Sequence, residues 1–220
     1  MPEVWQFTPT VFVVDDEEQM RSSLRALLDV LGFAVRTFPS GSSFARYYEP
    51  QMAGCLVLDV RMPRQTGLEL YEQLLQQGKR LPVIFITAHA DVPTAVAAMK
   101  TGAIEFLEKP FDRQMLLERV QAALALDAQW RHRDAQFAAI DERISRLTER
   151  EQQTLELVLT GESNKSMATK LLLTERAVEM RRSSIMRKLE VNSLAELLDL
   201  AVTHRILDEL RRAARELPAR

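Results

Sequence analysis

The stretch CLVLDVRMP, from Cys55 to Pro63, is the feature that most constrains how this chain can fold. An apolar run of this length, bounded by turn residues, is typical of a strand that a parallel sheet buries on both faces. Asp59 ends the run, and the residues up to Gly67 predict a turn after it. Open α/β sheets carry their chemistry at the carboxyl ends of the strands. A lone aspartate there is as often a helix cap or a turn former, so its meaning depends on the other strand ends.

Apolar runs alternate with helical patterns through the first part of the chain. Five strands alternating with five helices predict a parallel sheet covered on both faces. The expected strands are the run starting at Thr10, Phe33–Phe38, the run ending at Asp59, Pro82–Thr87 and Ile104–Leu107. The expected helices are one that stops at Gly32, Ser40–Tyr48, Gly67–Gln77, one from Asp91 to Gly102, and Phe111 to about Leu126.

Polar residues follow the strands on one edge of the expected sheet: Asp15, Asp16, Asp59, Thr87 and Lys109. Carboxyl ends of parallel strands converge, so three carboxylates would crowd together and repel unless a divalent cation lies among them. Oxygen ligands without a His or Cys cluster favour Mg²⁺. A carboxylate beside a metal ion, an ammonium group and a hydroxyl suits attack on a phosphoryl group.

Composition excludes several classes of protein. The chain has 220 residues, which suggests one large or two modest domains, and its net charge of −2 gives no global field for nucleic acid or membrane. The single cysteine, Cys55, lies in the expected buried strand and is read as a small core hydrophobe. No signal-peptide pattern opens the chain and no apolar run approaches the roughly 18 residues of a membrane span. We expect a cytoplasmic protein without a membrane partner.

Residues 1–125 resemble a response-regulator receiver domain. The resemblance rests on the acidic pair Asp15–Asp16, followed along the chain by Asp59, Thr87 and Lys109. The resemblance implies a flavodoxin-like α/β fold, a five-stranded parallel sheet of order 2-1-3-4-5. It implies that a histidine kinase phosphorylates Asp59 and that Mg²⁺ is the cofactor. The implied metal ligands are Asp15, Asp16 (the more direct of the pair), Asp59 and the backbone carbonyl of Arg61.

The same resemblance implies a switch made of Thr87, Phe106 and Lys109. Lysine would pair with the phosphoryl group, which adds about 1.5 to 2 negative charges. The Thr87 hydroxyl would turn toward it and vacate space for the Phe106 ring, where many relatives carry tyrosine. The face formed by the fourth helix, fifth strand and fifth helix would then be remodelled.

Residues 126–146 form the expected helical linker, a stretch without glycine or proline. Trp130, Phe137 and Ile144 are spaced by seven, which predicts a helix with a narrow apolar stripe. Three interpretations remain open: a short coiled coil, a signalling helix continuous with the fifth helix, or a helix packed on its own receiver.

Residues 147–220 predict an all-α four-helix domain. Thr148 and Glu151 have the spacing of a capping box. Helices expected at 164–171 and 174–189 are joined by a tight turn, and the second is rich in arginine, which is typical of a helix-turn-helix unit that docks in the major groove. A solvated charged face on an ordinary four-helix unit explains the same spacing equally well.

This second half resembles the LuxR-type helix-turn-helix of the NarL/FixJ family, on LTEREQQTLELV, GESNKSMA and IMRKLEVNSLAELL. Three positions depart from the family pattern: Leu172 stands where glycine is common, Ala177 where threonine is common and Arg181 where histidine is common. The resemblance implies base contacts by Glu179, Met180 and Ser183, and phosphate contacts by Lys165, Arg176, Arg182 and Lys188.

Together the two halves resemble a FixJ-like or StyR-like response regulator of a two-component system. The resemblance implies a regulator of transcription that is not a conventional enzyme and that loses its phosphoryl group by itself. The implied partners are a histidine kinase, double-stranded DNA with an inverted repeat, and a second copy in a phosphorylation-dependent homodimer. Two alternatives stay open. An aspartyl enzyme would need an acid two residues after Asp59, where Arg61 stands; an interaction module would bind a protein through its helical half.

Overall fold

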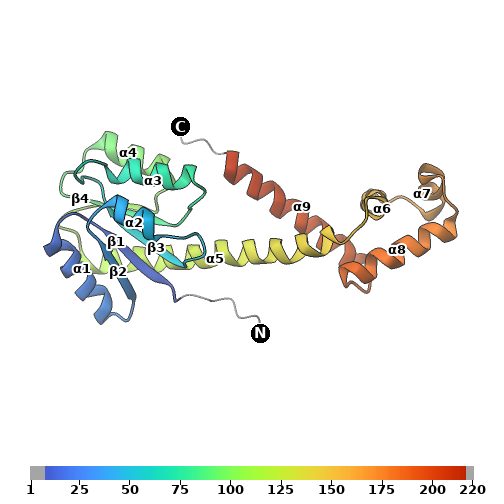
Figure 1. The fold of residues 1–220 in the computed structure, drawn as a ribbon, viewed down its shortest axis with the longest axis horizontal. Coiled ribbons are helices and arrows are strands. Elements are labelled where there is room, and N and C mark those ends of the chain that lie inside the picture. The colour runs from blue at the N-terminus through green and yellow to red at the C-terminus, as the bar shows by residue number, and fades with distance from the viewer. Residues whose placement is uncertain (1–7, 217–220) are drawn as a thin grey trace. The chain divides into compact units, whose positions relative to one another are not determined.

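The computed structural model describes residues 8–216, which divide into two compact units with the boundary between His132 and Arg133 (Figure 1). The first unit holds the whole sheet and the helices around it. The second unit is helical. A single helix, α5 (Arg113–Ser145), contributes to both units.

The first unit is a five-stranded parallel sheet of order β2-β1-β3-β4-β5. The predicted fold class and strand order are therefore confirmed. The strands are β1 (Thr10–Val14), β2 (Ala34–Phe38), β3 (Gly54–Asp59), β4 (Val83–Thr87) and β5 (Glu105–Glu108). The helices between and after them are α1 (Glu18–Val30), α2 (Gly41–Tyr47), α3 (Gly67–Gln76), α4 (Val92–Lys100) and α5.

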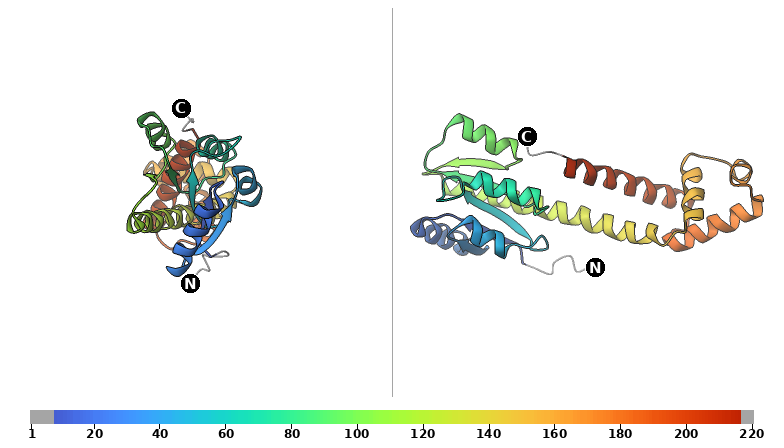
Figure 2. Two further views of the ribbon diagram at one scale, coloured as in Figure 1. Left: turned by 90° about the vertical axis from the view of Figure 1, so that its left-hand side faces the viewer. Right: turned by 45° about the horizontal axis from the view of Figure 1, so that its top comes forward.

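Helices cover both faces of the sheet, which explains why the strands read as unbroken apolar runs (Figure 2). Successive residues of a strand point to opposite faces. In β1, Val11 and Val13 pack with α1 and α5, whereas Phe12 and Val14 pack with α2 and α3. Since each face has its own apolar cluster, both sets of side chains must be apolar.

The second unit is built from α6 (Glu149–Leu159), α7 (Asn164–Leu171), α8 (Glu175–Leu189) and α9 (Leu194–Glu216), together with the last turns of α5. Thr148, Ser163 and Thr174 cap three of these helices, each accepting a hydrogen bond from a main-chain N–H of the first turn. The core of the unit contains Leu155, Val158, Met167, Val178, Ile185, Leu189 and Leu197. The predicted four-helix domain is confirmed.

The apolar stripe of the expected linker is covered by the chain itself. The Arg80 guanidinium lies 3.7 Å from the centroid of the Trp130 ring in the first unit. Phe137 is buried in the second unit, where its ring stacks on His204 at 5.0 Å, and Ile144 packs against the core of that unit. The interpretation as a helix continuous with the fifth helix agrees with the structure, and the stripe does not need a coiled-coil partner.

No helix within residues 8–216 is both long enough and apolar enough to cross a membrane.

Candidate functional site

Asp59, Asp15 and Lys109 form a buried triangle at the carboxyl edge of the sheet. The Lys109 ammonium donates to Asp59 Oδ1 at 2.7 Å and to Asp15 Oδ2 at 2.8 Å. Asp15 is fully buried and Asp59 is 5% exposed. The parallel register sets Asp59 opposite Ile86 and Thr87 opposite Glu108, so the ends of neighbouring strands reach the same edge. The structure thus brings together three of the residues predicted from the strand ends.

The electrostatics of this triangle leave one negative charge in excess. Burial raises the pKa of Asp59, Lys109 lowers it, and the nearby Asp15 raises it, with a net upward shift. Burial lowers the pKa of Lys109, but its bonds to Asp15 and Asp59 raise it more, so the lysine stays charged. One ammonium cannot neutralise two carboxylates, and the site therefore favours a further cation.

The main chain fixes the remaining carboxylate oxygens. The Arg61 N–H donates to Asp59 Oδ2 at 2.8 Å, and the Glu17 N–H donates to Asp15 Oδ1 at 2.8 Å. Asp16 lies exposed beside Asp15. Within the described chain, no three His, Cys, Asp or Glu side chains converge closely enough to hold a metal ion by themselves. Any metal here would need main-chain or water oxygens as well.

Of the other two predicted switch residues, Thr87 is joined to the triangle through its main chain, since the Lys109 N–H donates to the Thr87 carbonyl at 2.7 Å. Thr87 is fully buried, and its hydroxyl donates to the His89 carbonyl and accepts from the His89 N–H, both at 3.3 Å. Phe106 is partly buried against the cluster that α2 and α3 share with the sheet. The Arg61 side chain lies 3.6 Å from Asp91, the residue that caps α4.

Gly67 holds Asp59 in place in a way that the sequence did not reveal. A Cβ atom at this position would lie 2.2 Å from the Asp59 carbonyl oxygen, and the Gly67 N–H donates to the Val60 carbonyl at 2.9 Å. Only glycine allows this approach. The sequence signal, a glycine at the start of a helix, is equally typical of an ordinary turn.

A second feature that sequence reasoning missed fastens α5 to the opposite edge of the sheet. Asp127 is 3% exposed, and its Oδ2 accepts from the Gly54 N–H at 2.9 Å and from Arg131 Nε at 2.7 Å. Arg131 also donates to the carbonyls of residues 50, 51 and 52. We call Asp127 and Arg131 the α5 clamp. Both lie in the range expected to be linker, yet they belong to the first compact unit.

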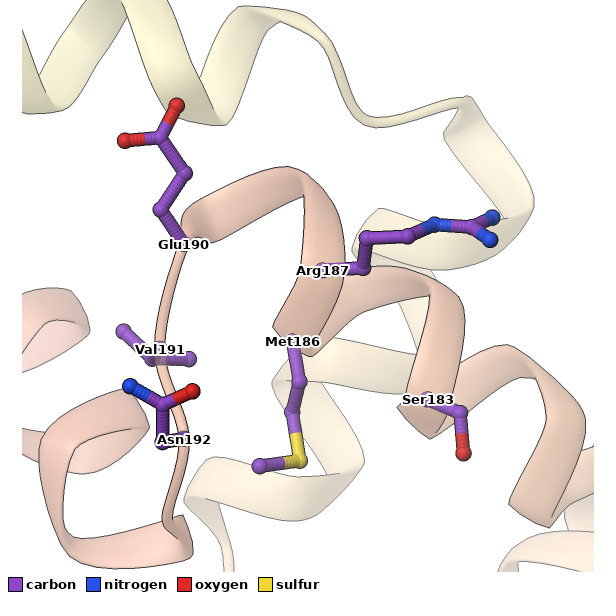
Figure 3. A pocket seen from close by; sticks show the side chains of 6 residues that line it. All are labelled: Ser183, Met186, Arg187, Glu190, Val191 and Asn192. Carbon is purple, nitrogen blue, oxygen red and sulfur yellow. The ribbon is translucent and has the colours of Figure 1, made fainter.

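In the second unit, α8 presents the residues predicted to contact bases. Glu179, Met180 and Ser183 are exposed, with Met180 at 69%. Ser183 also borders a shallow hollow at the end of α8 (Figure 3). The other residues that line this hollow are Met186, Arg187, Glu190, Val191 and Asn192.

The four predicted phosphate contacts divide into two pairs. Lys165 and Arg176 are exposed on α7 and α8. Arg182 is half-buried and donates to Asn164 Oδ1 at 2.6 Å, and Lys188 is half-buried and donates to Glu151 Oε2 at 2.6 Å. Of the four, Lys165 and Arg176 are the exposed ones.

The positions that depart from the expected helix-turn-helix pattern have distinct environments. Leu172 ends α7 in the left-handed region, with φ of 54°, and is 93% exposed. Glycine is favoured at such a position because it has no Cβ. The Ala177 N–H donates to the Thr174 hydroxyl, which caps α8, and Arg181 is half-buried.

Comparison with known proteins matches both units. Residues 11–121 match the family model described as response regulator receiver domain, and residues 145–201 match bacterial regulatory proteins, luxR family. The chain is 39% identical over 200 residues to the response regulator protein TodT of Pseudomonas putida, covering 91% of this chain and 87% of that one. It is 42% identical over 192 residues to the transcriptional regulatory protein FixJ of Azorhizobium caulinodans, covering 87% and 91%.

Solved structures agree with these matches. The response regulator StyR superposes with a TM-score of 0.81 at 47% identity, covering 88% of this chain and 98% of that chain. Full-length FixJ from B. japonicum superposes with a TM-score of 0.55 at 37% identity, covering 91% and 99%. On these similarities, this chain belongs to the response regulators that combine a receiver domain with a LuxR-type DNA-binding domain and regulate transcription.

Proposed function

We propose that Asp59 is the phosphoacceptor of this regulator and that a histidine kinase supplies the phosphoryl group. The observation that carries the proposal is the Lys109 ammonium held 2.7 Å from the buried Asp59 carboxylate. The carboxylate attacks the phosphorus atom, the bond from phosphorus to the kinase histidine breaks, and an acyl phosphate forms on Asp59. Lys109 offsets the charge that gathers on the phosphoryl oxygens.

We further propose that Mg²⁺ binds at this edge, through the carboxylates of Asp15, Asp16 and Asp59 and the Arg61 carbonyl. The excess negative charge and the purely oxygen donor set support Mg²⁺, which commonly uses one or two carboxylates and keeps several waters. When bound, the metal would neutralise phosphoryl oxygens. Asp16, which is exposed, is the carboxylate most free to turn toward the metal.

Thr87 and Phe106 are the proposed readout. The Thr87 hydroxyl bonds main-chain groups of His89 at 3.3 Å, a distance at the long end for hydrogen bonds between hydroxyl and amide groups. A phosphoryl group on Asp59 offers stronger acceptors, so the hydroxyl turns toward it and the partly buried Phe106 ring takes the vacated space. Hydrolysis of the acyl phosphate would reset the switch, without the activity of a conventional enzyme on external substrates.

For the second unit we propose binding of double-stranded DNA, with α8 in the major groove. Glu179, Met180 and Ser183 would face base edges, and Lys165 and Arg176 would contact phosphates. The exposure of these side chains on α8 and at the start of α7 supports this assignment. Arg182 remains a candidate that would first have to leave Asn164, whereas Lys188 is bonded to Glu151. A homodimer would bind an inverted repeat, since one unit covers few base pairs. A DNA-binding regulator works beside the chromosome, so we place it in the cytoplasm.

Two measurements test these proposals separately. With a small-molecule phosphodonor and Mg²⁺, we expect the wild-type chain to gain one phosphoryl group in an intact-mass spectrum and Asp59→Asn to gain none. Asp91→Asn, which replaces an exposed carboxylate nearby, is the matched control and should gain one.

For the second unit, we expect the wild-type chain to enrich related sequences from a random pool of duplexes, and Met180→Ala to change the enriched sequence. Phosphorylation of Asp59→Asn, or a pool that stays random, would refute the respective proposal.

A further inference from the structure

Lys188 is a basic residue of α8 whose ammonium group is bonded to other residues of the second unit. Its ammonium donates to Glu151 Oε2 at 2.6 Å and to the Arg146 carbonyl at 3.2 Å. The Lys188 side chain is 30% exposed and that of Glu151 is 9% exposed. Lys165, by contrast, is exposed on α7. A lysine held in this way is poorly placed to contact a DNA phosphate.

The two partners of Lys188 belong to two other segments of the second unit. Arg146 follows directly after the last residue of α5, so its carbonyl is one of the acceptors that a helix end leaves without an intrahelical donor. Glu151 is the acidic member of the capping box that starts α6. Lys188 therefore joins the end of α5 and the start of α6 to the last turn of α8.

Glu151 is the centre of this arrangement, which we call the Glu151 node: Glu151, Thr148, Ser184, Lys188 and the Arg146 carbonyl. Besides Lys188, its carboxylate accepts from the Thr148 N–H and hydroxyl at 2.8 and 2.9 Å and from the Ser184 hydroxyl at 2.7 Å. Burial raises the pKa of Glu151, but these donors outweigh it and bring the pKa to about 2. The node stays charged and fully bonded, as a buried polar network must to hold a fixed geometry.

We propose that Lys188 is a positioning residue, which fixes the direction of α8 relative to the end of α5 through the Glu151 node and makes no phosphate contact of its own. Any movement at the end of α5 then reaches the exposed face of α8 through the Glu151 node, beside the ion pairs that Arg143 and Arg146 form with Glu190, the residue that ends α8, at 3.7 and 3.5 Å. The effect on DNA rests on the proposed function of α8, whereas the geometric part concerns the second unit alone.

The geometric part is tested without DNA, by the distance between spin labels at Ala139→Cys on α5 and Ser183→Cys on α8. Both positions are exposed, and Cys55, buried with a raised thiol pKa, stays unlabelled. We expect a narrow distance distribution for the parent and for Lys188→Arg, and a broad or shifted one for Lys188→Met and Glu151→Gln. An unchanged distribution in Lys188→Met overturns the proposal. If that variant loses its helical circular dichroism, Lys188→Gln replaces it and is judged in the same way.

The phosphate part is tested by the salt dependence of binding to the duplex that the wild-type chain enriches. Removing a phosphate contact lowers the slope of log affinity against log salt by about one. We expect this of Lys165→Met, the control. Lys188→Met should weaken binding about tenfold with an unchanged slope, and combining it with Glu151→Gln should add little further loss. A slope reduced by about one in Lys188→Met, with Glu151→Gln neutral, overturns the proposal. If no duplex is enriched, the proposed DNA binding fails, while the spin labels still decide the role of Lys188.

Discussion

At the scale of single residues, the position of Asp59 depends on a neighbour that has no side chain. Gly67 approaches the Asp59 main chain so closely that an added Cβ would lie 2.2 Å from the Asp59 carbonyl oxygen. The Asp59 main chain cannot shift to relieve this clash without moving the Asp59 carboxylate. We expect Gly67→Ala to slow phosphorylation of Asp59 by a small-molecule donor by about tenfold to a hundredfold, as displacements near one ångström do. The measurement is the rate at which the protein gains the mass of a phosphoryl group, followed in quenched samples.

Gly78→Ala is the matched control for this prediction. Gly78 has φ of 70° with nothing within 4 Å of the added Cβ, so the substitution strains the backbone by about 1 kcal/mol without touching the site. Its phosphorylation rate should equal that of the wild type. Equal rates in both variants would mean that the Asp59 carboxylate tolerates the shift.

Glu151 gives the second unit a defined response to acid. Its pKa is about 2 in the folded chain, against about 4.3 in an unfolded one, so its contribution to stability is complete above pH 4.3 and is lost as the pH falls toward 2. The difference in unfolding free energy between wild type and Glu151→Gln should therefore be constant above about pH 4.5 and shrink below it. Hydrogen exchange of amides in α6 and α8 measures it. A difference that stays constant down to pH 2.5 would contradict the role of the Glu151 carboxylate.

At the scale of elements, the α5 clamp decides where the first unit ends. Asp127 and Arg131 bind main-chain groups of residues 50–54, so the turn of α5 that carries them is part of the first unit. We expect Arg131→Met to leave Asp127 buried without its cation and to lower the stability of this unit by about 3 kcal/mol. Amides of residues 124–132 should exchange faster. Arg133→Met, an exposed arginine just beyond the clamp, is the control and should change neither.

Element types were predictable from sequence because their causes are local. The apolar runs of β1, β3 and β4 and the capping residues Thr148 and Thr174 each act within a few positions. The strand ends could be paired because parallel strands converge, which brought Asp59 and Lys109 together correctly. The α5 clamp could not be predicted, since its acceptors are carbonyls about 80 residues away and a main-chain carbonyl leaves no mark in a sequence. Likewise, the family resemblance implies a phosphate contact for Lys188, and no pattern in the sequence reveals Glu151 and the Arg146 carbonyl as its partners.

At the scale of the whole molecule, the proposed phosphorylation of Asp59 has to change how the protein assembles or binds DNA. α4 leaves Val92, Val96 and Met99 exposed at 77%, 46% and 49%, spaced so that they share one side of the helix. Asp91, the cap of α4, lies beside Arg61, two residues from Asp59. A change at Asp59 therefore starts next to an apolar surface that single copies leave open to water, and a second copy of the chain would cover it.

We expect beryllofluoride, a mimic of the phosphoryl group, to double the sedimenting mass of the 25.1 kDa chain in the presence of Mg²⁺. Asp59→Ala should keep the monomer mass because it has no carboxylate to bind the mimic. Val96→Asp should also stay monomeric, since it places a charge in the apolar surface, yet it should still gain a phosphoryl group on Asp59 at the wild-type rate. Analytical ultracentrifugation measures the masses. If wild type and Asp59→Ala keep one mass throughout, dimerisation is not the output, and phosphorylation must act by exposing α8 within a fixed assembly. If wild type doubles and Val96→Asp doubles with it, the dimer forms on another surface than α4.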